Sequence, residues 1–135
     1  MKMDNIAKLP IKATTDSAGY DLYSAEAKVI EPGNRSFIST KIKIQMPKQC
    51  FGQLLSRSSL AKQGVDVAAG LIDSDYTGEI KVLLVNNSNE MFPILPGDRI
   101  AQLVVMTKQN TTAYIAPFDS FSTIRGNHGF GSSGK

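Results

Sequence analysis

Residues 38–46 read Ile-Ser-Thr-Lys-Ile-Lys-Ile-Gln-Met, so apolar residues or threonine alternate with polar residues over the whole stretch. Strict alternation is typical of a β-strand that has one face on a hydrophobic core and the other in water. A Pro-Gly turn signal at residues 31–34 precedes the stretch, and Pro47 follows it. The stretch therefore predicts a half-buried strand of an antiparallel sheet.

Short apolar runs separated by turn signals recur along the rest of the chain, about every 8 to 12 residues. Helix signals are nearly absent. Residues 58–64 form the one helix candidate, with Ser58 or Ser59 as its cap and Gly64 at its end. This pattern predicts an all-β sandwich or barrel with one short helix. Further strands are expected at residues 20–24, 51–55, 65–69, 80–85, 99–106 and 114–118.

Composition limits the class of protein. The 135 residues suffice for one domain, and the net charge of +3 is spread without a basic block, which argues against binding of duplex nucleic acid. Cys50 is the only cysteine and His128 the only histidine, so an internal disulfide is excluded and a zinc enzyme is not expected. The sequence has neither the apolar core of a secretion signal nor an apolar run of about 18 residues. We expect an intracellular protein that does not enter a membrane.

Residues 70–80 concentrate polar groups between two apolar runs. Asp73, Asp75 and Tyr76 lie between two glycines, and we expect them on an irregular loop that joins the strands on either side. Loops held by a rigid sheet often carry functional groups. Aspartate and glycine are also ordinary turn residues, so an acidic turn without a function is an equally open interpretation of this stretch alone.

Three further polar positions are candidates for ligand contacts. Asp21 alternates with Tyr20 and Leu22, which puts its carboxylate on the opposite face of that strand, toward solvent or a ligand. Arg57 before a serine-rich helix start suits a phosphate, although a surface arginine beside a capped helix fits the same pattern. Gln102 interrupts an apolar run, so it either faces solvent or has a hydrogen-bond partner.

The last eleven residues, 125–135, are rich in glycine and serine. Their glycines match the spacing of a dinucleotide-binding loop and, with the final lysine, that of a phosphate-binding loop. Both loops need a following helix, which this sequence lacks. We therefore expect either a disordered end or an arm that becomes ordered on a ligand. An arm that closes over a base and a phosphate chain would use Arg125, Phe130, Ser132 and Ser133.

Five segments, taken together, resemble the homotrimeric dUTP diphosphatase (dUTPase) family. They occur in the family's order and at its spacing, and they extend from residue 18 to residue 134. One such segment would be a weak signal, whereas five in register are a strong one. The segments are 18–22, 56–61, 70–79, 96–103 and 125–134.

The resemblance implies a jelly-roll-like, distorted β-barrel or sandwich at residues 1–124 and a flexible glycine-rich arm at residues 125–135. It implies a homotrimer whose three active sites lie between subunits, each closed by the arm of another subunit. The implied reaction is hydrolysis of dUTP to dUMP and pyrophosphate with Mg²⁺. Such a reaction keeps uracil out of DNA and supplies dUMP for dTMP synthesis.

The same resemblance implies roles for individual residues. Asp73 is the implied general base that activates water for attack on the α-phosphorus, and Asp21 the implied Mg²⁺ residue, acting through bound water. Tyr76 is expected beneath the sugar, where it leaves no room for a 2′-hydroxyl, and Phe130 over uracil. The implied substrate contacts are Arg57, Ser58, Ser59, Val67, Ala69, Gly70, Ile72, Tyr76, Gln102, Arg125, Phe130, Gly131, Ser132 and Ser133.

The chain departs from the family at four motif positions. Ser56 replaces a usual Pro, and Ser59 replaces a usual Gly, where a side chain is expected to crowd the phosphates. His128 replaces a frequent Gly, and Ser133 replaces a frequent Thr and keeps the hydroxyl. These departures put affinity in question more than activity.

Two alternatives stay open at this point. One is a dCTP deaminase or a bifunctional deaminase–diphosphatase of the same fold, for which no added acid or base is evident in the sequence. The other is a catalytically silent binding module, which would be expected to lack Asp73, Asp21 or the arm.

Overall fold

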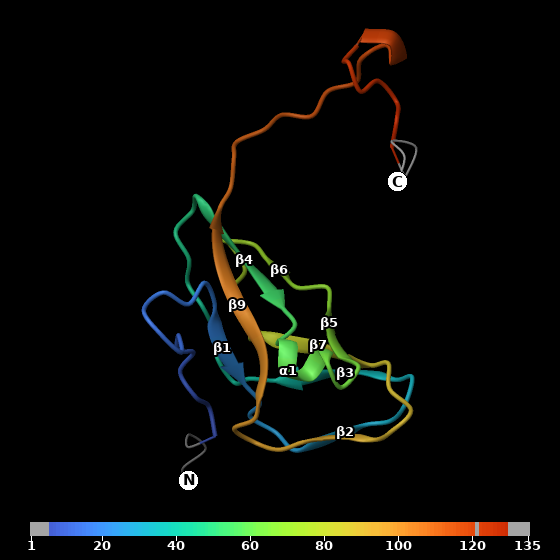
Figure 1. The fold of residues 1–135 in the computed structure, drawn as a ribbon. Helices are drawn as coiled ribbons and strands as arrows, with labels where there is room; N and C mark the ends of the chain where they lie inside the picture. Colours follow the sequence, from blue (N-terminus) through green and yellow to red (C-terminus); the bar gives the residue numbers. More distant parts are fainter. Residues whose placement is uncertain (1–5, 121, 130–135) are drawn as a thin grey trace.

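The computed structural model describes residues 6–120 and 122–129, and its regular elements are almost all β-strands (Figure 1). The largest sheet has four antiparallel strands in the order β1-β9-β4-β6. A second sheet has the order β3-β7-β5, and β2 pairs with β8 in a third. The elements are β1 (Tyr20–Tyr23), β2 (Lys28–Ile30), β3 (Arg35–Ser39), β4 (Cys50–Leu55), α1 (Ser58–Ala61), β5 (Val65–Ala68), β6 (Leu71–Ile72), β7 (Lys81–Asn86), β8 (Phe92–Ile94), β9 (Arg99–Thr107) and a 3₁₀ turn, η1 (Phe118–Ser120).

One hydrophobic core draws on both larger sheets. Leu22, Leu54 and Leu103 come from the four-stranded sheet, and Ile38 and Leu84 from the three-stranded sheet; all five are buried. Alternate residues of a strand point to the same face, so the apolar positions of both sheets meet in this core. The sheets do not close into a barrel, and their arrangement is a jelly-roll-like fold, as predicted.

Residues 38–46 form a shorter strand than their alternation predicts, because β3 ends at Ser39. The alternation of burial nevertheless continues beyond the strand. The prediction of a half-buried stretch is confirmed, whereas the prediction of a continuous strand to residue 46 is wrong. The alternate residues that are buried or packed on the core are Ile38, Thr40, Ile42, Ile44 and Met46.

Strand β3 ends at Ser39 because the next residues, 41–42, form irregular hydrogen bonds with residues 79–80. Lys41 adopts a left-handed backbone conformation with φ of +57°, and its N–H donates to the Glu79 carboxylate at 3.0 Å. The Ile42 carbonyl then accepts from the Ile80 N–H at 2.9 Å. Residues 79–80, which directly precede β7 and are far from this stretch in sequence, therefore continue the pairing of β3 with β7 in an irregular form.

The two strands expected around residues 70–80 are present and pair with each other. β5 and β7 are antiparallel, with Val67 opposite Leu84. The connection between them contains the additional short strand β6, which pairs with β4 of the other sheet. Gly70 permits this crossing: its φ is +132°, and an added Cβ would lie 2.9 Å from Leu54 Cβ.

Two local expectations are wrong. Neither Ser58 nor Ser59 caps α1, whose N-cap residue is Arg57 and has no side-chain cap hydrogen bond. Residues 114–118 do not form a strand. The chain leaves the body after β9 and extends away from it (Figure 1). An apolar run makes a strand only where it pairs with the edge of another strand, and this segment pairs with none among the described residues.

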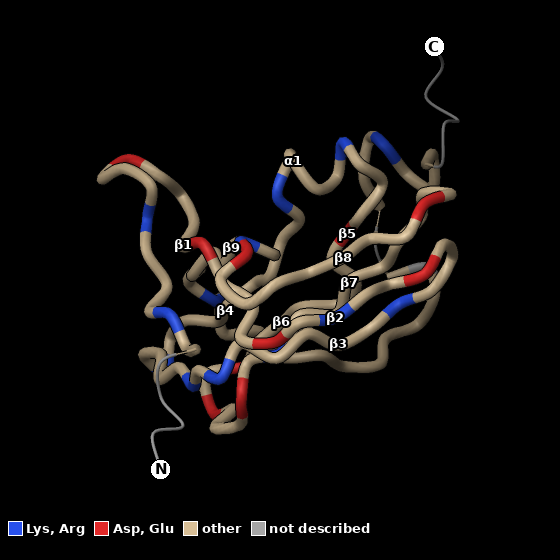
Figure 2. The backbone as a smooth tube through the Cα atoms, turned by 90° about the horizontal axis from the view of Figure 1, so that it is seen from below, with Lys and Arg blue, Asp and Glu red and all other residues tan. Residues whose placement is uncertain are grey.

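Charged residues are distributed over the whole backbone (Figure 2), without a stripe of lysine and arginine along one element. Within the described ranges, no helix has the length and apolar character needed to cross a membrane.

Candidate active site

The first candidate region is a cavity of about 300 Å³ beside β6, which we call the β6 cavity. Backbone and small side chains of residues 68–70 form one wall, and Leu54 and Ile80 contribute apolar surface. Asp73, Tyr76, Glu79 and Lys81 supply its polar groups. A largely apolar hollow with a few placed polar groups is typical of a small-molecule site.

Asp73 is positioned by the strand that precedes it. Ile72 is buried and pairs with Gly52 of β4, which fixes the chain where the loop begins. The Asp73 carbonyl accepts from the Tyr76 N–H at 3.1 Å, so residues 73–76 form a tight turn. The Asp73 side chain is exposed, and its carboxylate makes no hydrogen bond with the described residues. The carboxylate is therefore accessible to a ligand or to solvent.

Glu79 closes the same loop. Its carboxylate accepts hydrogen bonds from Ser39 Oγ and from the Lys41 N–H. The Ser39 hydrogen bond lowers the pKa of the Glu79 carboxyl below its usual 4.5. The Lys41 N–H and the positive charges of Lys81 and Lys41 act in the same direction, against partial burial. Glu79 is thus held ionised as a structural group of the loop.

The second candidate region lies beside β1 and is a cleft of about 320 Å³, which we call the Asp21 cleft. Asp21 Oδ1 lies 3.1 Å from Arg57 Nε, and Asp21 Oδ2 lies 3.5 Å from Arg99 Nη1. The Asp21 side chain is only 15% exposed, while the Arg99 side chain is 52% exposed. Ser58 and Gln102 also line the cleft. Two guanidinium groups, a hydroxyl and an amide make it a suitable anion site.

Gln102 has the hydrogen-bond partner that its place in an apolar strand predicts. It lies opposite Asp21 in the β1–β9 register, and its Nε2 donates to the Ser56 carbonyl at 3.0 Å. Ser56 Oγ in turn accepts from the Val67 N–H at 2.9 Å. Ser56, one of the departures from the family pattern, thus connects the Asp21 cleft to β5.

The two regions are at opposite edges of the four-stranded sheet, because β9 and β4 separate β1 from β6. Three strand spacings amount to about 14 Å. Their lining residues do not overlap. The two regions are therefore separate candidate sites within one chain.

A model of the dUTPase family matches residues 5–134 of the sequence. The chain belongs to the dUTPase family. The deoxyuridine 5′-triphosphate nucleotidohydrolase of vaccinia virus (strain Copenhagen) is 43% identical over 138 residues, which cover 99% of this chain and 90% of the relative. The variola virus enzyme of the same name is 44% identical over 135 residues, with 99% and 90% covered.

Solved structures of the family share the fold. A Staphylococcus bacteriophage 80alpha dUTPase mutant with bound dUpNHpp has a TM-score of 0.90 and 26% identity, and the match covers 98% of this chain and 95% of that one. A mutant dUTPase of phage phi11 of S. aureus, described with a structural Mg(II) ion, has a TM-score of 0.79 and 25% identity over 87% of this chain and 95% of that one.

The residues that the family resemblance implies fall into distinct groups in the structure. Val67 lines neither region, and its N–H is already bonded to Ser56. Ser59 accepts a hydrogen bond from Arg57 Nη1 at 3.3 Å and does not line the Asp21 cleft. The residues at the β6 cavity are Ala69, Gly70, Ile72, Asp73 and Tyr76, and those at the Asp21 cleft are Asp21, Arg57, Ser58 and Gln102.

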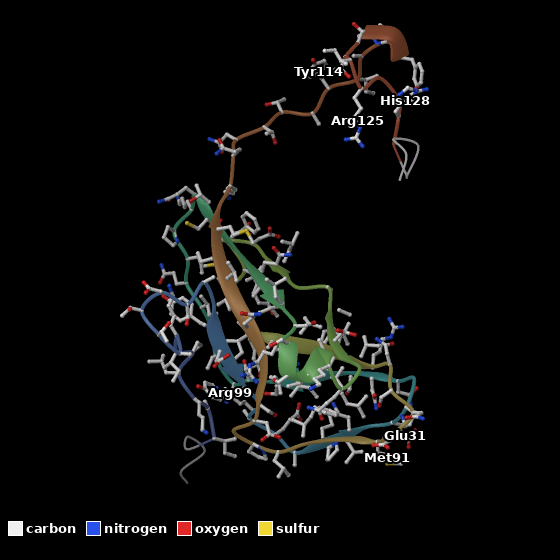
Figure 3. The ribbon with its side chains drawn as sticks, viewed as in Figure 1. Glu31, Met91, Arg99, Tyr114, Arg125 and His128 are labelled. Carbon is white, nitrogen blue, oxygen red and sulfur yellow. The ribbon has the colours of Figure 1, made fainter. Side chains whose placement is uncertain are left out.

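Arg125, the one predicted arm contact among the described residues, is not assembled with either group. Arg125 lies on the segment that extends from the body, far from Arg99 (Figure 3). Its Nε donates to the His128 carbonyl at 2.8 Å. The remaining arm predictions, Phe130, Gly131, Ser132 and Ser133, lie outside the described residues.

Sequence reasoning missed Arg99 as a site residue. It begins β9 directly after a Pro-Gly-Asp turn, and only the pairing of β1 with β9 brings it beside Asp21. Two features of the sequence could have indicated this contact. Arg99 is a cation at the start of an apolar strand, and Asp21 is a carboxylate in another strand with no evident partner nearby in sequence.

The donor set fits a magnesium ion of the kind that keeps most of its water. Within residues 6–120 and 122–129, no three His, Cys, Asp or Glu side chains gather in a way that could hold a metal ion. Asp21 alone supplies a carboxylate to the cleft, and each of its oxygens retains a lone pair beside its arginine contact. Mg²⁺ is commonly bound by substrate phosphates and one carboxylate, partly through water.

Proposed function

We propose that this chain hydrolyses dUTP to dUMP and pyrophosphate. The observation on which the proposal rests is the pairing of an apolar cavity that ends in an accessible carboxylate, Asp73, with a separate cleft that contains Arg57 and Arg99. A deoxyuridine fits the first and a triphosphate the second. Membership of the dUTPase family supports this assignment.

The β6 cavity is the proposed nucleoside half. Residues 68–70 present backbone groups beside small side chains, so peptide N–H and C=O groups can approach and read a pyrimidine edge. A tight wall of this kind excludes the methyl group of thymine, and fixed donors and acceptors reject the hydrogen-bond pattern of cytosine. The Tyr76 ring at the cavity forms the proposed contact with the sugar.

The proposed chemical step uses Asp73 as general base. Its carboxylate takes a proton from a water molecule, and the water oxygen attacks the α-phosphorus. The bond from that phosphorus to the bridging oxygen then breaks, and pyrophosphate leaves. Arg57, Arg99 and Ser58 bind and orient the triphosphate oxygens. Mg²⁺ held through water by Asp21 supplies further charge neutralisation on the phosphates when bound.

We further propose a homotrimer in which the β6 cavity of one subunit faces the Asp21 cleft of another. The two regions of one subunit lie at opposite sheet edges, so a second copy is the natural source of the missing half. The segment after β9 supports assembly, because its apolar side chains are unpacked: Ile115 is 102% and Phe118 99% exposed. Residues 1–124 are the proposed body, and 125–135 the proposed arm that closes a site of another subunit.

Pyrophosphate release from dUTP, dTTP, dCTP and UTP in the presence of Mg²⁺ tests the activity. We expect turnover of dUTP and rates at least about 100-fold lower for the other three, the discrimination that a polar, size-limited pocket provides. Ammonia release from dCTP would instead indicate a deaminase. Binding of dUTP without release of pyrophosphate would indicate the silent binding module and contradict the proposal.

A further inference from the structure

The Tyr76 ring lies directly against Gly78 in the loop of the β6 cavity. A methyl group on Gly78 would lie 2.4 Å from Tyr76 Oη, 2.6 Å from Cζ and 3.0 Å from Cε2. Gly78 is not among the residues with positive φ, so its backbone conformation does not itself require glycine. The Tyr76 ring, 47% exposed, occupies the space that a side chain at this position would fill, so a larger residue would have to displace the ring.

The hydroxyl end of the ring is fixed by the next residue. Tyr76 Oη donates to the Glu79 carbonyl at 2.9 Å. The Glu79 carboxylate in turn accepts from Ser39 Oγ and from the N–H of Lys41, whose left-handed φ of +57° is costly for a residue other than glycine. The hydrogen bonds of Glu79 therefore define one position for its carbonyl and for the hydroxyl bonded to it.

Ile80 strengthens the same attachment. Its N–H donates to the Ile42 carbonyl at 2.9 Å, and its carbonyl accepts a hydrogen bond from Thr40 Oγ1. Ile80 is also buried in the core. The end of the loop is thus tied to the segment that follows β3, and the Tyr76 ring is placed relative to the rigid body of the fold.

We propose that Gly78 and Glu79 are positioning residues that hold the Tyr76 ring in one place, and that this rigidity sets the selection of deoxyribose over ribose. The proposal rests on the proposed function, since it assigns the ring to the sugar. If the Tyr76 ring could rotate away, it would make room for the 2′-hydroxyl group of ribose. A ring backed by the Gly78 main chain and bonded at its far end cannot retreat, so the extra group meets a fixed wall.

The decisive experiment is a double-mutant cycle of Gly78→Ala and Tyr76→Ala, read by thermal melting and by the ratio of kcat/KM for dUTP to that for UTP. In the parent background we expect Gly78→Ala to lower the melting temperature and to reduce the dUTP preference about tenfold, the scale of overpacking. In the Tyr76→Ala background the ring is gone, so Gly78→Ala should change neither quantity.

The two readouts separate the possible failures. Equal effects of Gly78→Ala in both backgrounds would show that glycine serves the backbone rather than the ring, and would overturn the proposal. Coupling in melting without any change in dUTP preference would overturn the role in selection. Melting needs no substrate, so it tests the contact with the ring even if the chain does not hydrolyse dUTP.

The role of Glu79 has its own comparison. Glu79→Ala removes the acceptor for Ser39 and Lys41 and should reduce the dUTP preference severalfold, whereas Glu79→Gln keeps an acceptor oxygen and should restore most of it. Glu90→Ala is the matched control, because it removes an exposed carboxylate that makes no hydrogen bond with the described residues and lies outside both regions. An effect of Glu79→Ala no larger than that of Glu90→Ala would contradict the proposal.

Discussion

The two edges of the four-stranded sheet differ in how they present chemistry. At the β6 edge, Asp73 is exposed beside an apolar cavity and has no partner for its carboxylate among the described residues. At the β1 edge, Asp21 is largely buried and bonded to Arg57 and Arg99. The first arrangement suits recognition by shape and transfer of a proton, and the second suits neutralisation of charge.

This difference separates two demands that conflict in a single pocket. A cluster of arginines beside the proposed general base, Asp73, would attract its carboxylate and compete with the water that it is proposed to activate. Placement of the two groups on opposite edges keeps Asp73 free in each subunit. In the proposed assembly, the β6 cavity of one subunit faces the Asp21 cleft of another, and a bound nucleotide would contact both.

The largest effect is expected from removal of the proposed base. Asp73→Asn keeps the size of the side chain but cannot take a proton, so kcat should fall by about 10² to 10⁴, the usual contribution of a general base. KM for dUTP should change little, because the β6 cavity and the Asp21 cleft remain. Steady-state kinetics check this, and a variant with the parent kcat would remove Asp73 from the mechanism.

A smaller change in activity is expected when two impaired variants are refolded together. This experiment tests more directly whether the two sheet edges that form one site come from different subunits. Arg57→Ala loses a charge-assisted contact and should raise KM for dUTP about tenfold or more. Co-refolding equal amounts of Arg57→Ala and Asp73→Asn chains should restore full function to about a quarter of the sites. This fraction follows because each site draws its two halves from different subunits in a heterologous interface.

Assay at a dUTP concentration well below the KM of Arg57→Ala separates the restored sites from the background. The separately refolded variants, mixed only in the assay under conditions that prevent exchange of subunits, are the control. If co-refolding gives no more activity than this control, both halves come from the same subunit and the proposed division of the site fails.

The smallest effect concerns the loop that carries Asp73. The folded-state pKa of Glu79 is lowered, so this carboxylate stabilises the fold above its unfolded-state pKa and loses that contribution as the pH falls through the lower, folded-state pKa. The melting temperature of the parent should exceed that of Glu79→Gln near pH 7, and the gap should shrink as the pH falls below about 4. In a Ser39→Ala background, which lacks the main cause of the shift, the gap at neutral pH should be smaller. A gap that is constant with pH would contradict this assignment.

Local pattern was sufficient for much of the fold. The alternation around Ile38 gave the correct burial, and the apolar runs at residues 51–55 and 80–85 are β4 and most of β7. Local pattern failed to predict the structure where a residue distant in sequence determines whether a strand continues. The sequence around Lys41 gives no sign that its N–H donates to the distant Glu79 carboxylate, where the regular strand ends. The run at residues 114–118 looks like a strand because sequence cannot tell whether an edge is available to pair with it.

The site follows the same division. The sequence motifs contained Asp73, Asp21 and Gln102. In the structure, Asp73 lines the β6 cavity, and Asp21 and Gln102 line the Asp21 cleft. Arg99 was missed because its importance comes from the register of β1 against β9. The separation of the residues into two edges could be anticipated only from the resemblance to the family, since spacing along a chain does not reveal which edge of a sheet a residue occupies.

The place in the sequence where the hydrophobic core ends has a consequence for how the chain folds. Among the described residues, every member of the hydrophobic core lies from Leu22 to Leu103, so residues 108–120 and 122–129 add nothing to the interior of the body. Such a polypeptide can reach its native interior while the trailing segment is still unengaged. In the proposed assembly, docking of that segment would be a later, concentration-dependent event, and changes in the segment would weaken association without unfolding the body.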